Sequence, residues 1–177
     1  MRRLFGGPRV PPEVLERAGL ARGEKVLAAA ATDDGRWLLG TRDTFVVVEP
    51  PGGAADVLRI AWEHVESADW DRDQDRLRLT EVADFGCVRP VHVFAIPETS
   101  QLLQLVRERV TASVLLQRRV RLGDRRGLTV IARRPPYGGG EVTWAFELDP
   151  GVDPDDPAVR EAADRALRLA QDELRPI

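Results

Sequence analysis

Histidine and cysteine side chains are the groups best suited to acid–base, metal or nucleophilic chemistry, and this sequence holds only His64, His92 and Cys87. Neither histidine has another histidine or a cysteine at the spacing of a metal site. We therefore expect surface or capped histidines. Cys87 has no lysine nearby to favour a thiolate, which predicts a buried, inert thiol. An enzyme would need His64 or His92 in a cleft beside a carboxylate such as Glu66 or Asp84.

Three short motifs match known signatures but lack the groups that those signatures require. Asp84-Phe85-Gly86 spells the magnesium-binding tripeptide of kinases, yet the chain has one lysine, Lys25, and no His-Arg-Asp loop. Aspartates within residues 71–75 have the spacing that opens a calcium loop, but the later glycine and glutamate positions are not matched. The glycines at 138–140 join two predicted strands and are typical of a hairpin. We predict no catalytic residue, no metal, no cofactor and no enzyme activity.

Arginines concentrate in one hairpin, over residues 118–134. Between residues 107 and 134 the chain has nine arginines against two acidic residues. Strand alternation predicts that part of this set shares one polar sheet face, and the rest fills the turn. A face with five guanidinium groups could bind phosphates of nucleic acid, an anionic headgroup or an acidic protein segment. The candidate anion-binding or partner-binding residues are Arg119, Arg121 and Arg133 on the face, and Arg125 and Arg126 in the turn.

A second interpretation of the same face is a solvated surface with internal ion pairs. Glu141, Glu147 and Asp149 follow on the next predicted strand and point the same way. Cross-strand pairs of arginine and carboxylate would use much of the positive charge. Trp144 and Phe146 alternate to the other face, so the polar face has no aromatic platform for bases, and only Tyr137 at the hairpin tip is predicted to be free.

The elements that would position these residues begin with a β-rich segment. After a short helix that starts at Pro12 and ends at Gly19, about seven short strands follow within residues 25–96. An amphipathic helix comes next, with Leu103, Val106 and Val110 at helical spacing. This density of short strands predicts a barrel or sandwich, with the helix covering an open end of its core.

Three segments of this region resemble bacterial pleckstrin-homology-like domains. They are Gly23-Glu24-Lys25-Val26-Leu27-Ala28, Gly40-Thr41-Arg42 and Ile60-Ala61-Trp62-Glu63-His64-Val65. Together with the strand order and the single terminal helix, they look most like the uncharacterised proteins of this type from high-GC bacteria. The resemblance covers about residues 23–112. It implies a barrel with a C-terminal capping helix, acting as a binding or assembly module and not as an enzyme.

The rest of the chain predicts a separate unit of three strands and one helix. Apolar residues alternate along about 114–122, 128–133 and 142–149, which indicates an antiparallel sheet with one apolar face. Asp156 can cap the last helix, with Pro157 at its first position. Small alanines on one side of that helix let it lie close to the sheet. We expect this unit to pack against the first domain.

We therefore predict an α+β, mainly β fold in three parts. Residues 1–22 form an N-terminal arm and short helix, residues 23–112 the pleckstrin-homology-like barrel with its capping helix, and residues 113–177 an antiparallel three-stranded sheet plus one helix.

Composition bears on where the protein acts. The chain has 177 residues, of which 43% are apolar and 31% charged, and its formal net charge is −3. One cysteine cannot form an internal disulfide, the first residues have no apolar run typical of a secretory signal, and the longest apolar runs are too short to cross a bilayer. We expect a soluble, cytoplasmic protein.

The function that the sequence predicts is that of a non-enzymatic binding or scaffold protein, whose partner is another protein. The alternative is electrostatic binding of nucleic acid or of an anionic membrane surface by the arginine-rich hairpin at 118–134. Partner identity and oligomeric state are not encoded in any recognisable pattern.

Overall fold

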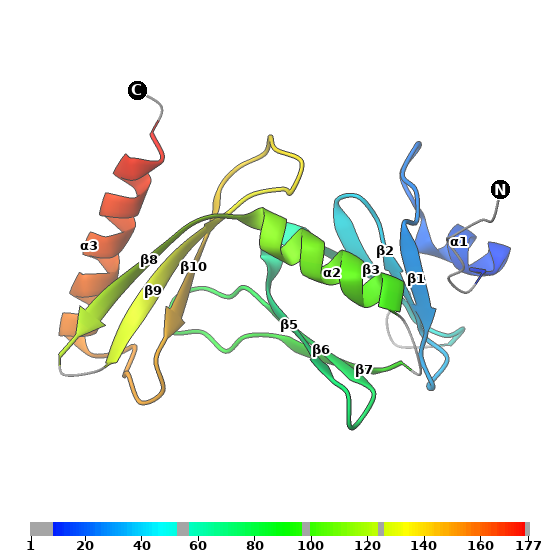
Figure 1. Ribbon diagram of the computed structural model, residues 1–177, viewed down its shortest axis with the longest axis horizontal. Coiled ribbons are helices and arrows are strands. Elements are labelled where there is room, and N and C mark those ends of the chain that lie inside the picture. Colours follow the sequence, from blue (N-terminus) through cyan, green and yellow to red (C-terminus); the bar gives the residue numbers. More distant parts are fainter. Residues whose placement is uncertain (1–8, 53–56, 97–99, 124–125, 176–177) are drawn as a thin grey trace.

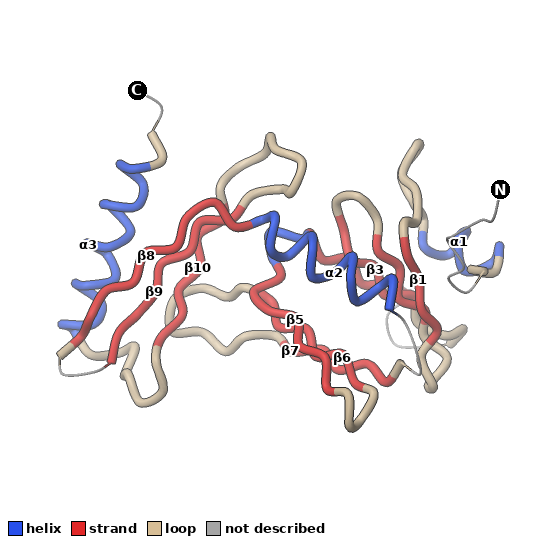
Figure 2. The backbone as a smooth tube through the Cα atoms, in the orientation of Figure 1, coloured by secondary structure: helices blue, strands red, loops and turns tan. Residues whose placement is uncertain are grey.

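The computed structural model describes residues 9–52, 57–96, 100–123 and 126–175 (Figure 1). The first eight residues of the expected arm, and Arg125 of the hairpin, lie outside the described residues. The described chain is α+β and mainly β, with three helices and three antiparallel sheets (Figure 2). In this part of the chain no helix has both the length and the apolar character needed to cross a bilayer.

The first sheet carries the N-terminal helix on its outer face. Its strands pair in the order β1-β2-β3-β4. Pro12 stands at the start of the helix, and Gly19 ends it with a φ of +56°, so both predicted boundary residues are confirmed. Val14 and Ala18 of the helix pack on Leu39 and Val46 of the sheet. The elements are α1 (Pro12–Ala18), β1 (Ala28–Ala31), β2 (Trp37–Gly40), β3 (Thr44–Val48) and β4 (Val57–Ala61).

The main core lies between the inner face of the first sheet, the second sheet and the helix at residues 100–113. The second sheet has the order β5-β6-β7, and α2 lies over the open side between the two sheets (Figure 1). Phe45 packs against both Trp62 and Phe94, with ring centroids 5.9 Å apart in each pair. Trp62 is fully buried and donates from Nε1 to the Thr41 carbonyl, at 3.2 Å. The elements are η1 (Trp62–His64), β5 (Val65–Asp71), β6 (Arg76–Glu81), β7 (Val91–Ala95) and α2 (Ser100–Ser113).

The seven strands do not form the closed barrel that the sequence predicted. Among the described residues, none of the three sheets closes on itself. The ladder stops after β4 because η1 turns the chain before β5 begins. The two sheets meet instead through the β1–β2 turn, where the Asp33 amide donates to the Ala95 carbonyl at 3.2 Å. Arg36 in the same turn donates to the Val93 carbonyl at 3.4 Å and lies over the Phe94 ring.

The third sheet and the last helix form the predicted unit of three strands and one helix. Strands pair in the order β10-β9-β8, and α3 covers one face (Figure 1). Asp156 caps the helix by accepting from the Ala158 amide at 2.8 Å, and Pro157 follows it, as predicted. Buried Val159, Ala163 and Ala166 lie against the sheet. The elements are β8 (Val114–Leu122), β9 (Arg126–Arg133), β10 (Thr143–Leu148) and α3 (Pro157–Glu173).

The third sheet is tied to the first domain at the edge strand β10. Arg89, in the connection between β6 and β7, donates from Nη2 to the Phe146 carbonyl at 2.6 Å. Phe85 of the same connection packs edge-on against the Phe146 ring, with centroids 5.2 Å apart. The expected packing of the C-terminal unit against the first domain is therefore present in the structure.

Stability at acid pH should depend on the carboxylate in the β1–β2 turn. Hydrogen bonds from Arg36 and from Thr32 lower the pKa of Asp34 from 3.8 to about 2. The pKa of Asp34 is lower in the folded protein than in the unfolded chain, so the ionised carboxylate stabilises the fold at pH values above the pKa of the unfolded chain. This stabilisation is lost as the pH falls through the pKa of Asp34 in the folded protein. Asp34→Asn should therefore lose less unfolding free energy than the wild type between pH 5 and pH 2, as measured by urea denaturation.

The matched control is Asp73→Asn, in another exposed turn, which should follow the wild-type pH dependence. Parallel curves for the wild type and Asp34→Asn would contradict the assigned role of this turn.

Candidate functional site

The buried side chain of Arg133 is the main departure from the predicted arginine face. Alternation along β9 placed it on an exposed polar face, but it is only 3% exposed. Its Nη1 donates to the Ser113 hydroxyl at 2.8 Å and to the Val110 carbonyl at 3.2 Å, and its Nη2 donates to the Glu66 carbonyl at 2.8 Å. The end of α2 and the start of β5 therefore cover this part of the sheet. The guanidinium lies inside the junction between the two domains and not at the surface.

Electrostatics in this junction are those of a compensated, buried cluster. Burial lowers the pKa of Arg133, while the carboxylates of Glu147 and Glu66 act in the opposite direction. Burial raises the pKa of Glu66, and the hydrogen bond from Arg89 opposes that shift. Arg89 donates from Nε to the Glu66 carboxylate while its Nη2 is bound to β10. Arg89 and Glu66 thus pair with each other, whereas Arg133 uses its two Nη atoms on carbonyls and a hydroxyl, and its buried Nε has no hydrogen-bond partner among the described residues. These contacts make the junction a structural joint between the domains.

The exposed arginines of the hairpin are divided between internal pairs and solvent. Arg119 makes a two-point pair with Asp149, at 3.2 and 2.5 Å, and Asp149 also accepts from the Gly127 amide at 2.8 Å. This is the cross-strand pairing expected in the solvated-face interpretation. Arg121 is exposed and has no hydrogen-bond or ion-pair partner among the described residues. Arg126 donates to the Gly151 carbonyl.

Arg121 and Arg126 do come together at one place, the end of the hairpin beside α3. They line a pocket of about 490 Å³ with the first turn of the helix, including Ala158 and Val159. The pocket also contains Asp153 and Asp156. The two arginines thus share their pocket with two carboxylates, and Arg125, predicted for the same turn, lies outside the described residues.

The two histidines considered for catalysis are placed in different elements, and neither lies in a described pocket. His92 on β7 has its Nε2 2.6 Å from Glu81 Oε1 on the neighbouring strand, so its carboxylate partner is Glu81. His64 is exposed at the end of η1. His64 and His92 line neither the pocket beside α3, nor the groove between β5 and α2, nor the pocket at the end of the first sheet.

The prediction of a buried Cys87 is wrong. Its side chain is exposed, and the next residue, Val88, is 94% exposed. The cause is the turn around Gly86, which has a φ of +76° and carries the chain out between β6 and β7.

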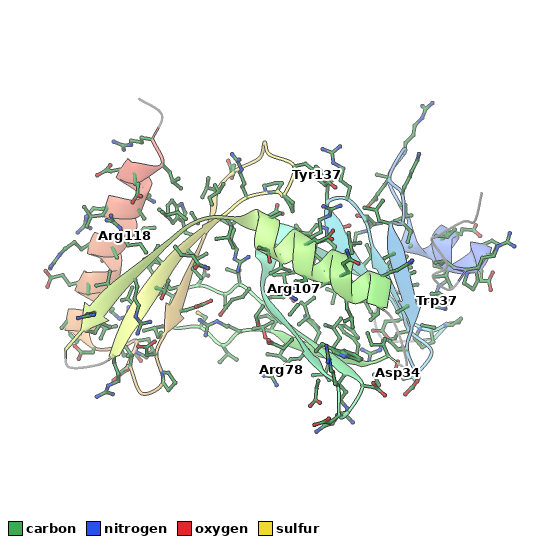
Figure 3. The ribbon with its side chains drawn as sticks, in the orientation of Figure 1. Asp34, Trp37, Arg78, Arg107, Arg118 and Tyr137 are labelled. Carbon is green, nitrogen blue, oxygen red and sulfur yellow. The ribbon has the colours of Figure 1, made fainter. Side chains whose placement is uncertain are left out.

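A groove between β5 and α2 is the feature that the sequence analysis missed. Its volume is about 490 Å³, and its floor is made by Leu77 of β6 and Val106 of α2, both buried. Half-buried Trp70 and Leu103 stand on its two sides. Asp69, Arg72 and Arg107 line its rim, and Figure 3 shows Arg107 between α2 and the second sheet. The helical stripe that contains Leu103 and Val106 is visible in the sequence, but its spacing does not show that a groove stays open beside β5.

Comparisons of this chain with protein-family models, with curated proteins and with solved structures find no match.

Replacing the junction arginine should weaken the whole fold. Arg133→Met retains the aliphatic volume but leaves the Glu66 carbonyl and the Ser113 hydroxyl without their charged donor. We expect a loss of about 2–3 kcal/mol of unfolding free energy, measured by urea denaturation. Arg121→Met, on an exposed and unpaired arginine of the same hairpin, should change stability by no more than about 0.5 kcal/mol. Equal effects of the two substitutions would show that Arg133 does not join the domains.

Proposed function

We propose that this protein is a non-enzymatic binding module of the cytoplasm, which takes up an extended segment of another protein in the groove between β5 and α2. The observation that carries the proposal is an apolar groove directly beside the free edge of a strand. In this proposal the first domain, residues 23–112, is pleckstrin-homology-like. Seven strands followed by one helix over the open side of the core support that assignment.

The backbone of β5 supplies the first part of a binding surface. The strand is at the edge of its sheet and pairs only with β6 among the described residues. Arg133 binds the Glu66 carbonyl near the start of β5, which leaves residues 67–71 for a further strand. An extended peptide that adds to such an edge gains main-chain hydrogen bonds regardless of its sequence.

The side chains of the groove supply the second part, which is selectivity. A segment laid along β5 would place alternate side chains over Trp70 and Leu103, where apolar groups lose contact with water. Large buried anchors of this kind contribute most of the affinity in protein interfaces. We infer that the partner segment is extended and carries at least one large apolar residue.

The groove is also well supported from beneath. Leu77 is 1% exposed and Val106 is 2% exposed, so the floor of the groove is part of the main core. A binding surface that is already in place needs little ordering when the partner arrives, which favours affinity.

A second candidate function is electrostatic binding of nucleic acid or of an anionic membrane surface by the hairpin at 118–134. The observation that favours it is the pocket that contains Arg121 and Arg126 beside the first turn of α3. Arg121 has no internal partner among the described residues, so its charge is available. Asp153 and Asp156 line the same pocket and reduce its positive potential.

The groove is tested by blocking it without disturbing the rest of the surface. Leu103→Glu puts a charge on its wall, and Ala68→Phe fills it with an apolar ring. Intact protein and both variants are used to recover partners from a lysate of the native organism, and bound proteins are quantified by mass spectrometry. At least one protein should be strongly depleted with both variants, and a synthetic peptide from it should bind the wild type in isothermal titration calorimetry.

Leu169→Glu is the matched control, because Leu169 is a half-exposed leucine on α3, away from the groove. It should recover the same partners as the wild type, and thermal melts should show that all variants are folded. If every recovered protein binds the groove variants and the wild type equally, the groove is not the binding site.

The second candidate predicts binding that falls steeply with added salt. Fluorescence anisotropy with RNA and DNA, and cosedimentation with anionic vesicles, should show this fall between 50 and 200 mM salt. The double substitution Arg121→Ala and Arg126→Ala should weaken binding about tenfold or more, since two charged contacts are lost. Arg168→Ala, on the exposed side of α3, should have little effect. Absence of binding at low salt would exclude this function.

A further inference from the structure

A third pocket lies at the end of the first sheet, near the segment that joins α1 to β1. Its volume is about 570 Å³. Residues from three parts of the chain line it: the segment 21–27, the β2–β3 turn at 42–44, and Arg59 on β4. It is separate from the groove between β5 and α2 and shares no lining residue with it.

The cationic side chains of this pocket are largely unused within the protein. Arg22 and Lys25 are exposed and have no hydrogen-bond or ion-pair partner among the described residues. Lys25 is also the only lysine in the chain. Arg42 has one carboxylate near it, that of its neighbour Asp43, at 3.5 Å. Three cations therefore line one pocket with little internal neutralisation.

The other charged pair in the pocket is committed to the structure. Arg59 donates from Nη2 to the carbonyls of Ala18 and Gly19, at 2.5 and 2.8 Å, and so holds the end of α1. Glu24 accepts from the Ala21 amide at 2.9 Å and from the Thr44 hydroxyl at 3.2 Å, and it lies 3.5 Å from Arg59. Burial alone would raise the pKa of Glu24, but these hydrogen bonds and Arg59 keep it below its ordinary value. Glu24 and Arg59 thus cancel one another, and Asp43 is the remaining carboxylate.

Arg42 is held in place by a residue of the other domain. The guanidinium groups of Arg42 and of Arg109 on α2 both lie over the Tyr137 ring, each with its Cζ 4.6 Å from the ring centroid. Figure 3 shows Tyr137 in the connection between β9 and β10, beside α2. The expectation that Tyr137 is free at the hairpin tip is therefore wrong, because the connection reaches the first domain. Stacking on an aromatic face fixes the orientation of a guanidinium without using its hydrogen-bond donors.

We propose that this pocket is a binding site for a compact polyanion that carries two or more phosphate groups. Arg22 and Lys25 supply donors from one side and Arg42 from the other, and Tyr137 acts as a positioning residue for Arg42. Phosphate oxygens suit these donors, because guanidinium and ammonium groups make short, charge-assisted hydrogen bonds to them. The polyanion is either a free polyphosphate or a phosphorylated lipid headgroup, and the two sources share this chemistry.

The test uses the full chain and two probes. Tripolyphosphate is titrated into the protein by isothermal titration calorimetry at low salt. Cosedimentation uses vesicles of phosphatidylcholine with diacylglycerol pyrophosphate, whose headgroup carries two phosphate groups. Binding to either probe should weaken about tenfold in each of Arg22→Ala, Lys25→Ala and Arg42→Ala, since each loses a charged contact. Arg168→Ala removes one exposed arginine on α3 and should leave the affinity within about twofold of wild type.

Substitutions of Tyr137 test whether the orientation of Arg42 matters for binding, beyond the general attraction between positive charges and a polyanion. Tyr137→Ala frees Arg42 and should weaken binding, whereas Tyr137→Phe keeps the ring and should bind like the wild type. Binding to tripolyphosphate identifies a soluble polyanion, and binding to vesicles alone identifies a headgroup; either supports the site. The proposal is overturned if neither probe binds at low salt, if Arg168→Ala weakens binding as much as the pocket variants, or if Tyr137→Ala matches Tyr137→Phe.

Discussion

Arg133 lies where β9, α2 and β5 meet, and the hydrogen bonds of its guanidinium hold these three elements together. It extends from β9 to the end of α2 and to the start of β5, so a charge that would be costly to bury alone has acceptors on two sides. The chain passes from α2 at Ser113 directly into β8 at Val114, without a loop. The direction of the third sheet is therefore fixed both by chain continuity and by this buried side chain, which makes the two domains one structure.

The proposed sites follow from that junction. Arg133 occupies the start of β5 and Arg89 occupies the edge of β10, so the remaining edge of β5 stays open beside α2. The same arrangement carries the β9–β10 connection over α2, where Tyr137 meets Arg42 and Arg109. The groove uses residues of the first domain only, whereas the polyanion pocket depends on a ring from the second. In our proposal, ligand binding at this pocket therefore depends on the relative position of the two domains.

Arginine serves two different purposes in this chain, and charge counting does not separate them. Some guanidinium groups build the fold by donating to carbonyls, as Arg59 does at the end of α1 and Arg89 does at β10. The planar group with five donors suits this work, because it can satisfy several acceptors from one position. Others, such as Arg22 and Arg121, have no partner among the described residues and remain available for ligands. A basic stretch in the sequence can thus contain both arginines that hold the fold together and arginines that are available to bind a ligand.

Local patterns in the sequence determined the elements. Alternation of apolar residues indicated the strands, Pro12 and Gly19 marked the ends of α1, and the Asp156 cap and the stripe of alanines indicated α3. These depend on neighbours within a few residues, so a single sequence reveals them. Only the tertiary structure decided the rest. Alternation assigns Arg133 to one face of its strand, but it contains no information on what covers that face, and α2 and β5 cover it. The stacking of Tyr137 and the groove beside β5 likewise arise from contacts between residues distant in the chain.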